Sequence, residues 1–210
     1  MLYKTLNKEH PGRWLSWVHA LKEKLSVAVI EKPDPQTVEQ MMQVEISAHS
    51  DPWTYDSLME CFTDNCRNIG LYLNNELIGF CTVCILFDEA EIYTIGILKK
   101  YQGLGFGHKL LLRSLQICRE LGAERCFLEV RVSNAVALYL YDFYGFAITG
   151  TRKNYYSATS EHPAEDAYTM CCDLTTISMD NPFAYQDSNQ SNAQDSDPSN
   201  EQHSDPDAEQ

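Results

Sequence analysis

A short glycine-rich segment places the strongest constraint on how this chain can fold. Gly103, Gly105 and Gly107 lie within five residues, between an apolar run and an amphipathic segment. Glycine adopts backbone conformations that other residues avoid and lets the main chain approach a ligand closely. At the start of a helix, unpaired amides and the positive end of the helix dipole favour a bound anion. The segment therefore predicts a phosphate cradle, although a tight turn alone would use the same glycines.

Two well-known phosphate cradles do not match this segment. A Walker loop ends in Gly-Lys followed by Ser or Thr, whereas Gly107 is followed by His108 and Lys109 with no hydroxyl residue. The dinucleotide-binding fingerprint has two residues between its second and third glycines. Only one residue separates Gly105 from Gly107, so this fingerprint is excluded as well.

The rest of the chain predicts alternating strands and helices. Apolar runs predict strands over 26–31, 68–74, 77–87, 90–98, 125–131, 146–149 and 167–173. Helical spacing predicts helices over 13–25, 37–48, 54–66, 107–121 and 134–144. This order predicts an α/β or α+β domain with one mixed sheet of about seven strands, flanked by helices.

Charge is distributed unevenly and argues against nucleic acid as a partner. The formal net charge is −14, and residues 175–210 contain eight acidic residues but no Lys or Arg. That segment has too few apolar residues to pack and is expected to be disordered. The remainder has 22 acidic and 16 basic residues, without the clustered positive charge that phosphate contacts require. An acidic surface suits a cationic partner, although moderate acidity is common in soluble proteins.

Neither a membrane span nor an export signal is expected. The longest apolar run, 78–87, is too short to cross a bilayer, and the first ten residues contain no continuous apolar stretch. A soluble cytoplasmic protein is therefore expected, and its eight cysteines should be reduced core residues rather than a disulfide framework. Cys81-x-x-Cys84 has no second pair at zinc-finger spacing, which favours core packing over a metal or redox site.

A wider set of motifs resembles the GNAT superfamily of N-acetyltransferases. Gln102, Gly105 and Gly107 match its Q/R-x-x-G-x-G/A loop. The chain is also similar to the RimI type, the bacterial ribosomal-protein alanine N-acetyltransferases. That similarity lies in LEVR (128–131), SN (133–134), LY (140–141), GF (145–146), RKNYY (152–156), ED (165–166) and the substrate-side turn HSDPW (49–53). The resemblance covers roughly residues 26–174.

The resemblance implies a fold and a cofactor. In the GNAT fold, a mixed and mostly antiparallel sheet has two central strands, here 90–98 and 125–131, that splay apart to admit coenzyme A. Acetyl-CoA would be the acetyl donor, and no metal would be needed. By position, the backbone of Ile95, Gly96 and Ile97 would contact the pantetheine arm, and Asn134 would lie near the thioester. The remaining cofactor contacts, with the pyrophosphate held from Gly103 onward, would come from Gln102, Gly103, Leu104, Gly105, Phe106, Gly107 and His108.

The same resemblance implies two side chains for proton transfer. Glu129 matches the family's general base, and Tyr141, seven residues after Asn134, matches its general acid. Considered without the resemblance, Glu129 is a surface carboxylate paired with Arg131 on the same strand face, and Tyr141 is a packing residue. An α-amine has a pKa of about 8, against about 10.4 for lysine, so one glutamate would suffice as the base. Direct transfer is expected, because no cysteine occupies a nucleophile's position in these motifs.

The resemblance also implies an acceptor and a division of the chain. The acceptor would be a protein N-terminus beginning with alanine, that of small-subunit ribosomal protein number eighteen. The acidic body of the chain adds the expectation of a basic residue after that alanine. Residues 26–174 would form the catalytic domain, after an extension (1–25) with a short amphipathic helix and before the acidic tail (175–210). An enzyme for small-molecule amines and a catalytically silent binding module with the same fold remain as alternatives.

Overall fold

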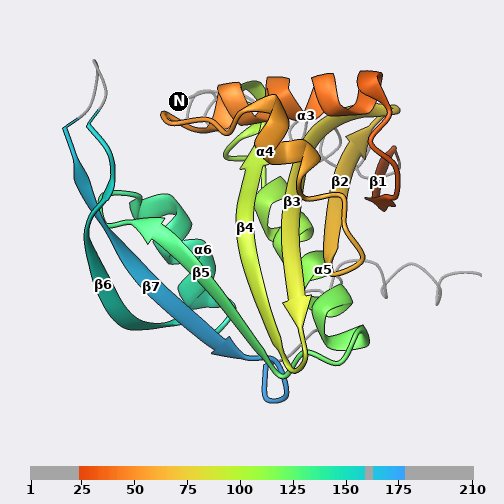
Figure 1. The fold of residues 1–210 in the computed structure, drawn as a ribbon. Coiled ribbons are helices and arrows are strands. Elements are labelled where there is room, and N and C mark those ends of the chain that lie inside the picture. Colours follow the sequence, from red (N-terminus) through yellow and green to blue (C-terminus); the bar gives the residue numbers. More distant parts are fainter. Residues whose placement is uncertain (1–23, 159–162, 178–210) are drawn as a thin grey trace, which may run out of the picture. The chain divides into compact units, whose positions relative to one another are not determined.

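The computed structural model describes residues 24–158 and 163–177, which form one sheet flanked by helices (Figure 1). The strands in chain order are β1 (Leu25–Ile30), β2 (Cys66–Leu73), β3 (Glu76–Leu86), β4 (Glu89–Ile97), β5 (Arg125–Arg131), β6 (Ala147–Tyr156) and β7 (Glu165–Asp173). The helices are α3 (Pro35–Ala48), α4 (Tyr55–Met59), α5 (Phe106–Glu120) and α6 (Ala135–Phe143), with a short 3-10 turn, η1 (Lys99–Tyr101).

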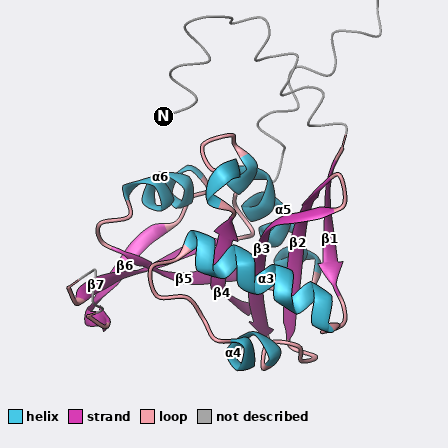
Figure 2. Ribbon diagram, turned by 90° about the horizontal axis from the view of Figure 1, so that it is seen from above, coloured by secondary structure: helices cyan, strands magenta, loops and turns pink. Residues whose placement is uncertain are grey.

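The seven strands are arranged in the order β1-β2-β3-β4-β5-β7-β6. Every neighbouring pair is antiparallel except β4 and β5, which run parallel. Helices α3 and α4 cover one face of the sheet and α5 covers the other (Figure 2). Adjacent residues of β3 show the two faces, because Phe80 packs with Met41 of α3 while Cys81 belongs to the cluster that contains Leu111 of α5. The predicted mixed, mostly antiparallel sheet is confirmed.

Strands β4 and β5 separate part-way along their length. Their register pairs run only from Glu89 with Arg125 to Ile92 with Leu128. Beyond these pairs, β4 continues to Ile97 without pairing to β5, and the two ribbons diverge in Figure 1. The predicted splayed pair is confirmed, and the far half of β4 has one edge without a neighbouring strand.

The helix predicted over 54–66 is much shorter in the structure. Helix α4 begins after the N-cap Thr54 and ends at Met59. The chain then turns, and the buried Asn68 side chain donates to the carbonyl of Cys61 at 3.1 Å. The apolar spacing of this segment therefore reflects packing of a turn against the core, not continued helix.

Two further predicted elements, the strand over 146–149 and the helix over 13–25, also have to be compared with the structure. The strand predicted over 146–149 extends to Tyr156, because it pairs with β7. Its residues are mostly exposed, so they lack the apolar alternation that would have predicted the longer strand. The helix predicted over 13–25 lies outside the described residues, apart from its end, where Leu25 begins β1 and pairs with Leu73. The acidic tail from residue 178 onward also lies outside them.

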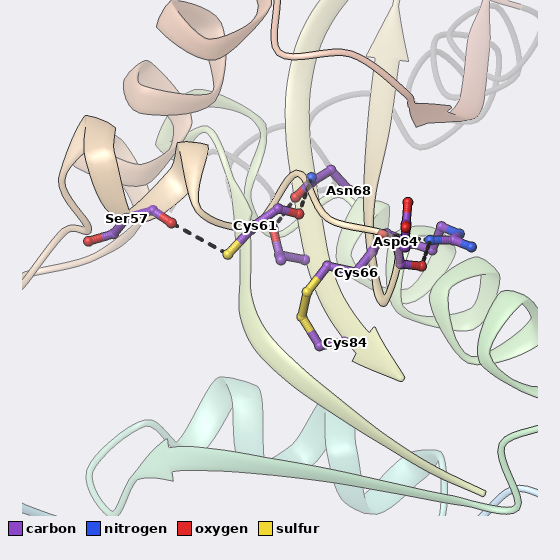
Figure 3. Close-up of a disulfide and its surroundings, with 8 residues drawn as sticks. Ser57, Cys61, Asp64, Cys66, Asn68 and Cys84 are labelled. Carbon is purple, nitrogen blue, oxygen red and sulfur yellow. Dashed lines mark hydrogen bonds between the residues drawn. A yellow bond between two sulfur atoms is a disulfide. The ribbon is translucent and has the colours of Figure 1, made fainter. Parts of the chain in front are cut away.

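The expectation that all cysteines are reduced is wrong for one pair. Cys66 and Cys84 form a disulfide between β2 and β3 (Figure 3). The antiparallel register places them directly opposite each other, which brings two residues 18 positions apart into bonding range. The other six cysteines are free, and all but Cys171 are buried. Within Cys81-x-x-Cys84, the core packing predicted from the sequence therefore holds for Cys81 alone.

None of the helices in the described part of the chain combines the length and apolar character needed to cross a membrane.

Candidate active site

The N-terminal end of α5 presents unpaired amide groups. Gly103 and Gly105 adopt left-handed conformations with φ of 76° and 83°, and Gly105 caps α5 without a side-chain hydrogen bond. Within the described chain, no backbone carbonyl accepts a hydrogen bond from the amides of residues 103–107. Together with the helix dipole, these donors suit a bound anion.

Buried neighbouring side chains and one hydrogen bond hold the loop of residues 102–107 in place. Phe106 is buried and lies edge-on to Tyr101 at 6.3 Å between ring centroids. Leu104 packs against the main core. The side-chain amide of Gln102 donates to the carbonyl of Ile97 at 2.9 Å, which joins the loop to the end of β4. The predicted cofactor loop is thus attached both to the core and to the end of β4.

His108 adds little positive charge to this end of α5. Its ring lies 5.2 Å from that of Phe143 and 5.8 Å from that of Tyr144, measured between centroids. Burial lowers the pKa of His108 below its usual value, so the imidazole is neutral at pH 7. Attraction for an anion at this site therefore comes from backbone amides and the helix dipole.

The open edge of β4 is formed by the backbone of Ile95 and Ile97. The amide of Leu98 donates to Ile78 of β3 at 2.8 Å. Because peptide groups alternate between the two edges of a strand, those of Ile97 and Ile95 point away from β3, toward the gap left by β5. Gly96 faces β3 and serves a different purpose, since a methyl group there would lie 3.0 Å from the Cβ of Ala48. Glycine at this position lets α3 pack closely against β4.

Asn134 lies at the start of α6, exposed to solvent. It is the N-cap residue, and its side-chain oxygen accepts from the amide of Ala137 at 3.1 Å. Helix α6 packs beside the start of α5, where the hydroxyl of Tyr144 donates to the carbonyl of His108 at 3.1 Å. The structure thus brings the predicted loop and the predicted Asn134 helix to the same face of the sheet.

Glu129 lies on β5 just beyond the last residue paired with β4. One carboxylate oxygen is ion-paired with Arg152, and the other accepts from the Tyr155 hydroxyl at 2.9 Å. Arg131, which the sequence suggested as the partner of Glu129, is instead ion-paired with Glu165 at 3.2 Å. Sequence reasoning missed Arg152 and Tyr155 as partners, because β6 lies two strands away from β5 in the sheet.

Glu129 is in the wall of a cavity of about 610 Å³. The cavity is bounded by β4 and β5 where they still pair, by β7, and by the turn before β2. Tyr93, in the same wall, lies 6.2 Å from the ring of Trp53. Since Trp53 packs in the cluster of α3 and α4, the cavity opens on their face of the sheet, opposite α5.

Tyr141 is buried on α6, with its ring 5.6 Å from that of Phe146. Burial raises the pKa of Tyr141 well above its usual value, so the hydroxyl keeps its proton throughout the physiological range. Within the described chain this hydroxyl makes no hydrogen bond, which leaves its proton available. Burial also raises the pKa of Tyr156; Arg131 opposes this rise and Glu129 adds to it.

A buried carboxylate that sequence reasoning missed holds the α3–α4 turn. Glu45 is only 1% exposed. It accepts from the amide of Trp53 at 3.2 Å and from the hydroxyl of Thr94 at 3.1 Å, and it lies 3.6 Å from His49. These contacts fix the turn that resembles the family's substrate-side loop against β4. The spacing of Glu45 and His49 on one helix face was the available signal.

Residues 32–146, more than half of the chain, match the acetyltransferase (GNAT) family. The chain belongs to this family. A GNAT relative from Haemophilus influenzae, named [Ribosomal protein bS18]-alanine N-acetyltransferase, is 36% identical over 148 residues, covering 70% of this chain and all of the relative. The protein of that name from Escherichia coli K12 is 31% identical over 132 residues, covering 63% of this chain and 88% of its own.

A solved structure agrees with this membership. The crystal structure of the ribosomal-protein-S18-alanine N-acetyltransferase from Escherichia coli has a TM-score of 0.65 and 28% sequence identity. The structural match covers 77% of this chain and 99% of the solved chain. The predicted GNAT resemblance and the predicted acetyltransferase class are therefore confirmed.

No three His, Cys, Asp or Glu side chains of the described residues lie close enough together to hold a metal ion.

Proposed function

We propose that this GNAT protein transfers the acetyl group of acetyl-CoA to a protein's N-terminal α-amine, with the N-terminal alanine of ribosomal protein bS18 as its acceptor. The separation of β4 and β5 carries the proposal. The separation leaves β4 with an open edge beside the amide-rich start of α5. Glu129 lies on β5 where the two strands part, on the face of the sheet opposite α5. The names of the Haemophilus and Escherichia relatives support the choice of acceptor.

The residues of the open edge fit acetyl-CoA. The amides of residues 103–107 suit its pyrophosphate, and a side chain at Gly103 or Gly105 would extend into the open space they face, since no heavy atom lies within 4 Å of where either Cβ would be. The peptide groups of Ile95 and the amide of Ile97, whose carbonyl already accepts from Gln102, suit the pantetheine amides, as a strand would. Asn134, the exposed N-cap residue of α6, has a side-chain amide nitrogen that is still able to donate.

When bound, acetyl-CoA supplies a thioester, an acyl group that is already activated. The protein must then position an uncharged amine and manage two protons. Glu129 accepts a proton from the acceptor's ammonium group, while Arg152 and Tyr155 hold its carboxylate in place. Tyr141 donates its hydroxyl proton to the departing sulfur. An α-amine, with a pKa of about 8, is partly deprotonated near neutral pH, so a carboxylate is an adequate base.

The proposal extends to the chain as a whole. Residues 26–174 act as the catalytic domain, the reaction takes place in the cytoplasm where ribosomal proteins are made, and neither metal nor nucleic acid takes part. The body of the chain is acidic, which favours association with a basic protein segment.

The test is intact-mass analysis of peptides incubated with the full chain and acetyl-CoA. The panel should contain an Ala-started peptide, peptides with Met, Gly or Leu in its place, an internal-lysine peptide with a blocked N-terminus, and a free polyamine. We expect one added acetyl group on the Ala-started peptide. Preference for the lysine peptide or the polyamine would assign a different amine, and no transfer to any amine would favour a silent binding module.

A further inference from the structure

Three carboxylates from two adjacent strands, one of them Glu129, line the cavity. Glu89 and Glu91 come from β4, and Glu129 comes from β5. All three alternate onto the same face of the sheet, with Glu91 opposite Phe127 and Glu129 two positions further along β5. The cavity would therefore attract a cationic group. Which carboxylate binds it depends on which of the three lacks a positively charged partner.

Two of these carboxylates already have a positive partner. Glu129 is ion-paired with Arg152, and Glu89 is ion-paired with Arg125 at 3.0 Å. Glu91 makes no hydrogen bond and no ion pair with any other residue that the structure describes. Among the three carboxylates, Glu91 is therefore the one without an ion pair to a described residue.

The surroundings of Glu91 penalise that charge. Partial burial raises the pKa of Glu91, and the nearby charge of Glu129 raises it further, with a smaller opposing effect from Arg152. A cation bound in the cavity would offset both effects, because it would interact favourably with the ionised form of Glu91. The electrostatic environment thus favours a positively charged ligand at Glu91.

The shape and lining of the cavity match a long cationic side chain. A volume of about 610 Å³ is far more than an N-terminal alanine needs. Much of the wall is apolar, with Leu86, Phe127 and Met170 among the lining residues. Lys and Arg bury an apolar stem against such surfaces while the charged end reaches a polar partner.

We propose that Glu91 is a specificity-determining residue that binds the side chain of a Lys or Arg at the second position of the acceptor. This inference rests on the proposed N-terminal acetyltransferase function. The acceptor amine lies at Glu129, and an extended peptide advances about 3.3 Å per residue. The second side chain therefore starts within reach of the neighbouring strand. Its stem lies along the apolar wall and its charge meets Glu91.

The experiment measures kcat/KM for a matched series of Ala-started peptides that differ only at the second residue. Lys, Arg, Gln and Glu at this position vary the charge while keeping a long side chain. The enzymes are the full-length wild type, Glu91→Gln, Glu91→Lys and the control Glu89→Gln, which removes a carboxylate already paired with Arg125 in the same wall. Melting temperatures establish that each variant is folded.

We expect the wild type to prefer Lys or Arg over Gln by about fivefold to tenfold at low salt, with the ratio shrinking at high salt. Glu91→Gln should abolish this ratio by slowing only the cationic peptides, Glu91→Lys should favour the Glu peptide, and Glu89→Gln should retain the wild-type ratio. A wild-type enzyme indifferent to charge, or a Glu91→Gln variant that slows all four peptides equally, would overturn the inference while leaving the proposed function intact. Failure of the wild type to acetylate any N-terminus would overturn both.

Discussion

The side chain of Arg152, on β6, reaches across β7 to form an ion pair with Glu129 on β5. Tyr155 of the same strand donates to the second carboxylate oxygen. Glu129 is therefore held from one side, at the point where β4 and β5 separate. In the proposed role of base, Glu129 would need no reorganisation when an acceptor amine arrives.

Replacing Glu129 with Gln should lower kcat by roughly 10²–10⁴-fold if it is the sole base. Affinity for coenzyme A should hardly change, because Glu129 lies on the cavity face and the cradle lies at α5. Steady-state kinetics and calorimetry together check both parts. Arg152→Gln is the matched control, since it breaks the same ion pair but retains the carboxylate, and it should cost about tenfold or less. Equal losses in the two variants would show that the ion pair matters and proton acceptance does not.

Replacing Tyr141 with Phe should slow turnover by a similar factor without destabilising the fold. The ring and its contact with Phe146 are retained, and the hydroxyl makes no hydrogen bond with the described residues. Because burial raises the pKa of Tyr141, the wild-type rate should show no loss attributable to this group between pH 6 and 9, where it stays protonated. Kinetics across that range and a melting curve provide the check. A large fall in melting temperature would mean that the hydroxyl is structural.

Replacing Gly107 with Val should weaken binding of coenzyme A while the protein remains folded. The first side-chain carbon at this position would lie 3.5 Å from a methyl group of Leu140, an ordinary contact distance. A valine there would add bulk toward α6 at the last of the five unpaired amides, 103–107. Gly105→Ala is a useful comparison, since its φ of 83° makes any side chain there costly to the fold itself. Calorimetry should show clearly reduced affinity for Gly107→Val, and unchanged affinity would remove the α5 amides from the binding site.

Local sequence patterns predicted most of the sheet but none of its long-range pairs. Strand β5 has the predicted bounds, because an apolar run bounded by polar turns is a local signal. The family resemblance predicted which two strands separate, and the strand register gives the position at which they do so. The Glu129–Arg152 pair and the Glu45–Thr94 hydrogen bond depend on strand order and register, which no single segment encodes.

The cysteines illustrate the same limit and give a simple test. Cys66 and Cys84 were expected to be reduced, but they face each other across β2 and β3 and form a disulfide. Alkylation of the denatured, unreduced protein should therefore modify six thiols, and alkylation after reduction should modify all eight. Intact mass counts the modified groups. Eight modified thiols without reduction would show that the pair is open in the purified protein.

Truncation after residue 177 should leave stability unchanged, whereas truncation after residue 174 should lower it slightly. Leu174 is fully buried, and its amide donates to the carbonyl of Glu124 at 2.8 Å. Ile177 also packs against the main core, with a methyl group 3.1 Å from where a Cβ on Gly145 would be. Among the described residues, the last core contact thus falls three residues beyond the boundary expected at 174, whereas the sequence of residues 178–210 is mostly polar and acidic. A chain ending at 177 should keep its melting temperature and kcat. A chain ending at 174 loses the Ile177 contact, which is worth about 1 kcal/mol, and should melt roughly 2–4 °C lower.

Calorimetric scans of both truncated chains beside the full-length protein make the comparison. A large loss of stability in the chain ending at 177 would show that the acidic segment contributes to the fold.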